Sequence, residues 1–427
     1  MRTAGTLIDP LSFDRMSDAR DSIPGSFFGL VRAGGALSPL LRSLCGVAAF
    51  VFVANVAAAP YVPVDDAQVL ERLPSRSAPQ FRDLRALQAA AAQAPDDLAR
   101  ALPLAAAYIR ASRVEGDPRF LGYAQAALAP WWKDAEAPTR VLVLRATILQ
   151  SSHQFAAALV DLDRVLQREP RNVQAILTRS TILTVQGNYA AARPDCGRLA
   201  GIAPPIYGAI CAAAIDSVTG NAREAYESLQ NATQTTPRMD DAGRLWAETL
   251  MGEIADRRRD PAAERHFRAA LAIGEKDAYL LGAYCDWLLD QGRPAEVVGL
   301  LQKENRNDIL LLRLALAQQA LRQPDATTLI EILRARFDAS HARGDTVHAR
   351  ENARFELALR NDAKAAVPYA IDSWKVQREP ADLRILAESA AAANDAAALT
   401  LVQRWLAESG IEYPVVAALT GGKGPGR

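Results

Sequence analysis

The chain has 427 residues, half of them hydrophobic, which is enough for one or two apolar cores at roughly 100–200 residues per domain. Ala, Leu, Arg, Gln and Glu dominate, and alternating runs of β-branched residues are nearly absent, so the composition favours an all-helical protein. Lys and Arg together number 49, and so do Asp and Glu. This balance argues against a nucleic-acid partner, because such a polyanion is held by an excess of basic residues.

A stretch near the N-terminus has the pattern of a secretory signal. Residues 43–59 read SLCGVAAFVFVANVAAA, carry no charge and follow a basic residue. These features predict a signal peptide over residues 1–59, cut between Ala58 and Ala59, with Met16 as an alternative start. Export would make the protein periplasmic or secreted. The competing interpretation is an uncleaved anchor in the inner membrane, although the run is shorter than the roughly 20 apolar residues that span a bilayer.

Two helical units are expected between this segment and the central part of the chain. Residues 60–94 are predicted to form N-terminal capping helices, over 65–73 and 79–92. Residues 95–138 are predicted to form one divergent helical hairpin.

One 34-residue pattern is written twice in succession between residues 139 and 205. The positions that recur are Ala146 and Ser180, Leu149 and Leu183, Phe155 and Tyr189, Ala158 and Ala192, Leu162 and Cys196, and Pro170 and Pro204. The small position continues at similar intervals through Ala225, Ala263 and Val297. A repeat of this length indicates stacked helical hairpins, because one hairpin cannot bury its apolar face alone. We therefore predict core repeats over residues 139–307.

The rest of the chain is expected to continue the array. Residues 308–412 are predicted to form C-terminal helical hairpins, and residues 413–427 a disordered tail. No globular stretch then remains for a catalytic domain. The chain also lacks C-x-x-C, H-E-x-x-H, G-x-S-x-G and phosphate-binding glycine motifs. We predict no catalytic, cofactor or metal site, and interpret the four histidines, His153, His266, His341 and His348, as ordinary surface residues.

On these residues the body of the chain resembles the tetratricopeptide-repeat (TPR) family, in an exported bacterial form. Small residues at the helix contacts, an aromatic residue after the turn and a Pro at the end of the second helix carry the resemblance. It implies a right-handed α-solenoid of stacked helix-turn-helix hairpins whose first helices line a concave groove, which commonly binds another protein or an extended peptide. Arg145 and Arg179 depart from the family pattern, which usually has Leu there.

Carried over repeat by repeat, the resemblance implies which residues line the groove. They are Arg140, Val143, Thr147, Gln150, Gln174, Leu177, Thr181, Thr184, Tyr207, Ile210, Ser217, Glu248, Asp256, Tyr279, Asp286 and Asp290. The clustered Lys, Asn and Arg with which chaperone adaptors of the family grip a carboxyl terminus do not appear, and the later part of the groove is expected to be acidic. The alternative is that these polar residues only keep a concave face hydrated.

Cys196 and Cys211 form a candidate disulfide. The repeat phase places Cys196 on the second helix of one hairpin and Cys211 on the first helix of the next, and such helices stack side by side. In an oxidising compartment a bridge between them would close a loop of about fifteen residues, worth around 3 kcal/mol in the chain-entropy model. The alternative is two buried thiols that never meet. Cys285 is expected to stay unpaired.

The sequence thus favours an exported, non-catalytic scaffold that binds a protein or an extended peptide, without a cofactor. Two other classes stay open. One is a hydrolase acting on cell-envelope material. The other is a membrane-tethered assembly factor for an envelope complex, which requires residues 43–59 to remain attached.

Overall fold

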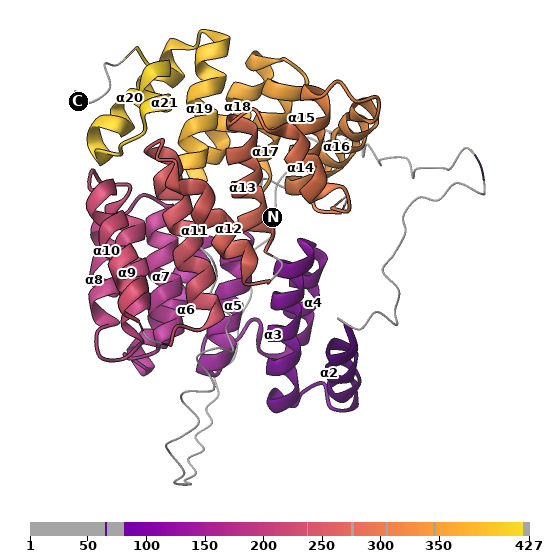
Figure 1. Ribbon diagram of the computed structural model, residues 1–427. Coiled ribbons are helices and arrows are strands. Elements are labelled where there is room, and N and C mark those ends of the chain that lie inside the picture. Colours follow the sequence, from indigo (N-terminus) through magenta and orange to yellow (C-terminus); the bar gives the residue numbers. More distant parts are fainter. Residues whose placement is uncertain are drawn as a thin grey trace, which may run out of the picture.

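Helical hairpins follow one another in sequence order along the chain (Figure 1). The computed structural model describes residue 65 and residues 81–421, apart from residues 237, 275–276, 305 and 345–346. Over this described part there is no β-strand, and most helices pack against the helix that follows them. The predicted all-α solenoid of stacked hairpins is therefore confirmed. The signal peptide expected over residues 1–59 and, apart from residue 65, the helix expected over 65–73 lie outside the described residues.

The helices before and within the repeats agree closely with the predicted ranges. The first unit contains α2 (Arg82–Gln93), α3 (Leu98–Glu115), α4 (Arg119–Ala127) and a 3₁₀ turn (Ala129–Trp131). The repeat region contains α5 (Thr139–Ser151), α6 (Phe155–Arg168), α7 (Val173–Val185), α8 (Tyr189–Arg198), α9 (Pro205–Asp216), α10 (Ala222–Thr235), α11 (Asp241–Arg257), α12 (Ala262–Ala272), α13 (Ala278–Asp290) and α14 (Pro294–Leu301).

The C-terminal part continues the alternation of first and second helices. It contains α15 (Asp308–Ala320), α16 (Asp325–Ala342), α17 (Ala349–Arg354) with a π-helical turn (Phe355–Leu359), α18 (Ala363–Val376), α19 (Pro380–Ala393), α20 (Ala396–Ser409) and α21 (Pro414–Leu419). None of the described helices combines the length and the apolar character needed to cross a bilayer.

The small residues of the repeat lie where the two helices of each hairpin meet. On the second helices they are fully or almost fully buried: Ala158, Ala192, Ala225, Ala263 and Val297. The corresponding positions on the first helices are buried as well: Ala146, Ser180, Ala213, Met251 and Cys285. Because close-packed interiors leave no room for extra atoms, the Ala, Ser and Cys side chains at most of these points let the helices of a hairpin approach each other, while Met251 and Val297 are the larger exceptions.

The same turn joins the two helices in hairpin after hairpin. Two or three residues before the second helix, the backbone is left-handed in seven hairpins of the described chain, at His153, Gly187, Gly220, Arg259, Gly292, Arg322 and Asn394. In each case the next N–H donates to the carbonyl five residues back, as in the bond from Gln154 to Leu149 (2.8 Å) and the bond from Asn188 to Leu183 (2.8 Å). This is the Schellman arrangement that ends a helix. The repeat is therefore encoded in turn geometry as well as in packing.

Arg145 and Arg179, the two departures from the family pattern, form ion pairs inside their own hairpins. The guanidinium of Arg145 donates to both carboxylate oxygens of Asp161 on the facing helix (2.7 Å each), and also to the carbonyls of Trp131, Trp132 and Asp134. The same bidentate pair recurs 34 residues later between Arg179 and Asp195 (2.8 and 2.6 Å). Both Asp residues are buried. Two successive repeats thus share the same polar contact between their helices.

The array curves until separate parts of it meet. Near the start of α13, Asp277 forms an ion pair with Arg113 of α3 (3.6 Å). The side chain of Asn307, just before α15, packs on Gly116 at the end of α3. The α3–α4 hairpin therefore contacts the starts of the α13–α14 and α15–α16 hairpins.

The C-terminal hairpins lie across the earlier ones, above them in Figure 1. The backbone N–H of Arg378 donates to the carbonyl of Val185 at the end of α7 (2.7 Å). Trp405 of α20 packs on Gly187 and on Tyr189, and Gly410 packs on Gly220. A second apolar core, formed by α17 to α21, takes in Val218 from the earlier part of the chain. The solenoid therefore closes on itself between the α7–α10 region and its C-terminal end.

The prediction of a disordered tail over residues 413–427 was wrong for its first part. Pro414–Leu419 form α21, and Val416 and Tyr413 are buried in the second core. Pro at the first helical position needs no N–H partner, and the apolar residues after it have a surface to cover. Residues 422–427 lie outside the described part of the chain.

Candidate functional site

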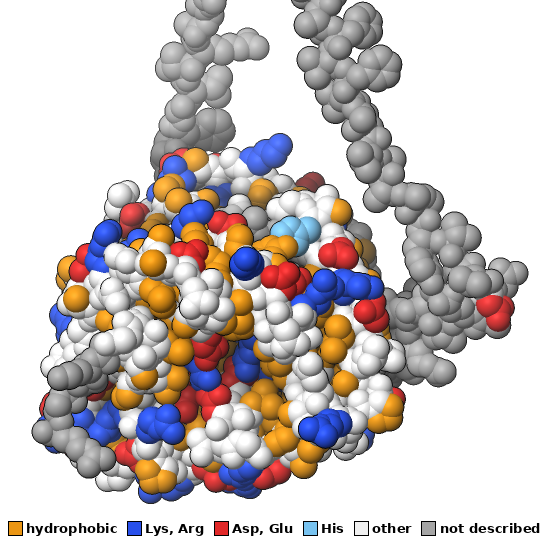
Figure 2. All heavy atoms as spheres, turned by 90° about the horizontal axis from the view of Figure 1, so that it is seen from above, with side chains coloured by type: hydrophobic (Ala, Val, Ile, Leu, Met, Phe, Trp, Pro, Cys, Tyr) orange, Lys and Arg blue, Asp and Glu red, His pale blue; other side chains and the backbone are white. Residues whose placement is uncertain are grey.

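The concave side of the solenoid encloses a cavity of about 270 Å³. The first helices of seven consecutive hairpins contribute to its wall: α7, α9, α11, α13, α15, α17 and α19. Figure 2, a view from above, shows a hollow near the centre of that face with acidic and basic side chains at its bottom. The wall combines these charges with apolar residues such as Leu177, Trp246 and Ile385. Such a concave site with convergent polar groups is the usual form of a ligand pocket.

Part of the predicted groove lines this cavity. The residues concerned are Leu177, Thr181, Thr184, Ser217, Asp256, Tyr279 and Asp286. Each belongs to the first helix of its hairpin or to the residue just after that helix. Seven of the groove positions that the resemblance implied therefore face the cavity.

The other predicted groove residues lie elsewhere. Val143, Thr147, Gln150, Gln174, Tyr207 and Ile210 are buried away from the cavity, and Arg140 is exposed. Tyr207 donates to the carboxylate of Asp240 (2.8 Å), and Glu248 bonds His266 Nδ1 (2.7 Å). Asp290 accepts from Arg384 of α19 (2.7 Å). These residues support the packing around the cavity without lining it.

The later part of the groove is neutralised and not acidic, contrary to the expectation from the sequence. Asp286 accepts hydrogen bonds from Arg313 (2.6 Å) and Arg354 (2.5 Å), which come from the following two hairpins. Among the described residues, six carboxylate and six Arg side chains line the cavity. The charges of the wall therefore balance when all are ionised.

Sequence reasoning missed the whole C-terminal side of this wall. Arg350 pairs with Glu379 (3.2 Å) and Glu351 (3.4 Å), and Arg384 pairs with Glu388 (2.6 Å). The first helices that carry these residues were expected, but the repeat pattern fades after residue 307, so no register assigned their inward positions. The only available signal was the density of Arg and Glu on helices that were expected to be stacked.

Two carboxyl groups one turn apart on α11 have raised pKa values. Burial, assisted by the charge of Asp290, raises the pKa of Asp256 to about 6. Burial also raises the pKa of Glu253, although the hydroxyl of Tyr279 donates a hydrogen bond to it. A proton is therefore held more tightly on this stretch of α11 than on a carboxyl in water.

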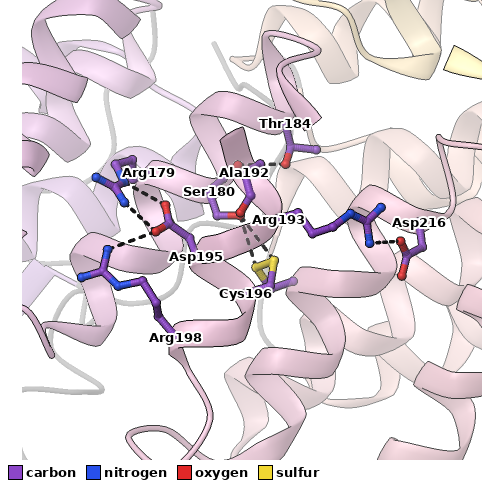
Figure 3. The surroundings of a disulfide bond; sticks show 10 residues. Arg179, Ser180, Thr184, Ala192, Arg193, Asp195, Cys196, Arg198 and Asp216 are labelled. Atoms are coloured by element: carbon purple, nitrogen blue, oxygen red, sulfur yellow. Dashed lines mark hydrogen bonds and ion pairs between the residues drawn. A yellow bond between two sulfur atoms is a disulfide. The ribbon is translucent and has the colours of Figure 1, made fainter. Parts of the chain in front are cut away.

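The candidate disulfide lies at the wall of the cavity. The sulfur atoms of Cys196 and Cys211 are 2.06 Å apart and their Cα atoms 5.4 Å apart, so the structure joins them as proposed. Figure 3 shows Ser180 next to the bond, with its hydroxyl 3.2 Å from the sulfur of Cys211. Ser180 and Cys211 both face the cavity. Cys285 is a free, buried thiol.

The histidines are not all surface residues, so that interpretation was wrong for two of them. His266 and His348 are buried, and His266 bonds both Tyr226 (2.6 Å) and Glu248. His341 is exposed. Burial lowers the pKa of His153 to about 3. The described residues contain no group of three potential ligands close enough to hold a metal ion.

Comparison with known proteins adds no assignment. No protein-family model matches the chain, and no curated protein matches it.

Proposed function

We propose that this protein is an exported, non-catalytic scaffold of the tetratricopeptide-repeat type, which binds a protein or an extended peptide on the concave side of its solenoid. The cavity supports this proposal most strongly, because seven successive first helices contribute side chains to one enclosed surface. Its mixture of apolar and balanced charged groups suits a peptide, which presents both.

In vivo photo-crosslinking tests this proposal. A photoreactive residue in place of Thr181, at the cavity wall, should crosslink to a second protein. The same residue in place of Val160, half exposed on the second helix α6, serves as the matched control. Crosslinks from position 160 alone would contradict the use of the concave side. N-terminal sequencing of the mature protein tests export, and a start after residue 58 is expected.

One observation favours the second candidate, a hydrolase acting on cell-envelope material. Groups with a raised pKa inside a pocket are typical of catalytic acids, and Glu253 and Asp256 both have one. If this candidate is right, Asp256→Asn abolishes turnover of envelope material. The scaffold proposal expects no turnover by the wild-type protein.

A further inference from the structure

Most of the charged groups around the cavity already have a partner of opposite charge. Asp286 is held by two arginines, Arg350 by several carboxylates, and Arg384 by Glu388 and Asp290. The guanidinium of Arg378 stacks over the ring of Trp405, 5.0 Å from its centre. Glu253 accepts from the hydroxyl of Tyr279. Four charged residues of the described wall therefore form no ion pair, Glu253, Asp256, Arg257 and Arg378, and two of them, Asp256 and Arg257, follow one another on α11.

Arg257 is a buried cation that forms no ion pair within the described chain. Its side chain is 6 % exposed and lies at the cavity wall. One terminal nitrogen donates to the hydroxyl (3.0 Å) and the carbonyl (3.2 Å) of Ser217, both uncharged groups. Among the described residues no carboxylate forms an ion pair with it, and its Nε–H has no acceptor. Since burying a charge without a partner is costly, this guanidinium is set up to receive an anionic group.

Asp256 is an anion in the same situation as Arg257. Its half-buried carboxylate lines the same cavity and, within the described chain, has no ion pair and accepts no hydrogen bond. The negative charges of Asp290 and Asp286 on α13 disfavour its ionised form. The positive charges of Arg384 and Arg257 favour it. A positively charged or N–H donor from outside the protein would satisfy it.

We propose that the cavity binds a small zwitterion, with the carboxylate of the ligand on Arg257 and its ammonium group on Asp256. A planar carboxylate matches the fork of a guanidinium and accepts two parallel hydrogen bonds. Asp256 and Arg257 are adjacent and opposite in charge, so a ligand that binds both carries one charge of each sign and no net charge. The chemical class is a free amino acid or a short peptide.

The size of the cavity sets the length of the ligand. Its volume of about 270 Å³ lies just below the range of roughly 300–1,000 Å³ that is usual for small-molecule sites. The cavity therefore takes one or two residues. This inference rests on the proposed function, since both use the concave cavity, and it limits the ligand held inside that cavity to one or two residues that carry both charges.

Titration calorimetry with defined probes tests the inference on the wild-type protein. The probes are L-alanyl-L-alanine, its N-acetyl derivative, its C-terminal amide, and free L-alanine. Binding of the dipeptide is expected, with a loss of about tenfold or more in affinity when either end is blocked, because each blocked end leaves a buried charge unpaired. Comparison of the dipeptide with L-alanine distinguishes a peptide site from an amino-acid site.

Two variants test the residues, and one serves as a matched control. Arg257→Gln and Asp256→Asn should each weaken dipeptide binding about tenfold. Asp256→Asn should also reduce the penalty for N-acetylation, which a merely structural role would not change. Arg404→Gln, on the exposed side of α20, should bind the dipeptide as the wild type does. If Arg257→Gln fails to fold, the inference is still tested by comparing the dipeptide with its N-acetyl and amide forms on the wild-type protein.

The outcomes separate this inference from the proposed function. No binding of the dipeptide at millimolar concentration would overturn the inference, whereas crosslinking from position 181 to a protein would leave the scaffold proposal standing. Equal affinity for the dipeptide and its amide would exclude the carboxylate site at Arg257. Equal affinity for the dipeptide and its N-acetyl form would exclude the role of Asp256.

Discussion

Trp405 of α20 packs directly on Gly187, in the turn between α7 and α8. A Cβ atom on Gly187 would lie 2.5 Å from Cη2 of the indole ring, and the backbone there is left-handed, with φ +74°. The contact joins residues more than two hundred positions apart, and it helps to hold the C-terminal hairpins over the concave side of the solenoid.

Gly187→Ala is expected to destabilise the fold by about 2–4 kcal/mol, because it adds a steric clash to the cost of a left-handed Ala. Gly292→Ala is the matched control: its φ is +66°, and no atom lies within 4 Å of the added Cβ. That variant should lose only about 1 kcal/mol. Chemical denaturation measures both free energies of unfolding. Equal losses would show that Trp405 does not cover Gly187.

The buried pair of Arg145 and Asp161 provides the second test. Asp161→Asn should destabilise the protein by about 3 kcal/mol, since it leaves a buried guanidinium without its counter-ion. Asp372→Asn removes the partner of Lys375 in a pair that is largely exposed, and should cost less than about 1 kcal/mol. Urea titration of the two variants compares them. A small loss for Asp161→Asn would mean that Arg145 is solvated.

Reduction of the disulfide should lower stability. Opening the bond between Cys196 and Cys211, which are 15 residues apart, is expected to cost about 3 kcal/mol in the chain-entropy model. Thermal unfolding with and without dithiothreitol measures the change, and the double variant Cys196→Ser, Cys211→Ser should no longer respond to the reductant. Cys285→Ser retains the bond and should respond as the wild type does. An unchanged melting temperature of the reduced wild-type protein would exclude a stabilising bridge.

Asp256 should make stability depend on pH between about 4 and 6. Its pKa in the folded protein is raised to about 6, above the value of about 3.9 for an exposed Asp, so the native state binds more protons than the unfolded state over this range. The contribution of this carboxyl is therefore favourable at low pH and is lost as the pH rises through 6. After allowance for partial solvent access, we expect a loss of about 2 kcal/mol.

Denaturation of the wild type and of Asp256→Asn at pH 4, 5, 6 and 7 tests this sign. The free energy of unfolding of the wild type should decrease between pH 4 and pH 6, and the variant should lack this contribution. The difference in free energy of unfolding between the two proteins therefore changes with pH in that window. If the free energies of unfolding of the two proteins change in parallel with pH, Asp256 titrates as an exposed carboxyl does.

The repeated parts of the fold could be predicted because local rules and packing agree there. Ala158, Ala192 and Ala225 recur with the repeat, and all three are buried at helix contacts. The left-handed turn position is equally regular. Gly at 187, 220 and 292 indicates it in the sequence, whereas His153 and Arg259 have the same backbone conformation without being residues that predict it. The pair Arg145 and Asp161 also recurs after 34 residues, a signal that could have been read from the sequence.

The candidate site could be predicted only in part, because half of its wall depends on curvature. Thr181 and Asp256 are groove positions that the resemblance implied, whereas Arg350 and Arg384 reach the same cavity only because the solenoid closes on itself. Small rotations between successive hairpins add up to that closure, and no local pattern specifies them. The burial of α21 has the same cause, since the surface that it covers comes from distant parts of the chain.

A charge-reversal cycle at Asp290 of α13 and Arg384 of α19 tests the closure most directly, since these residues lie 94 positions apart and form two hydrogen bonds. Asp290→Arg and Arg384→Asp should each destabilise the protein, and the double variant should regain about 1 kcal/mol relative to the sum of the two single losses. Strictly additive losses, with no recovery in the double variant, would contradict a solenoid whose C-terminal hairpins complete the cavity.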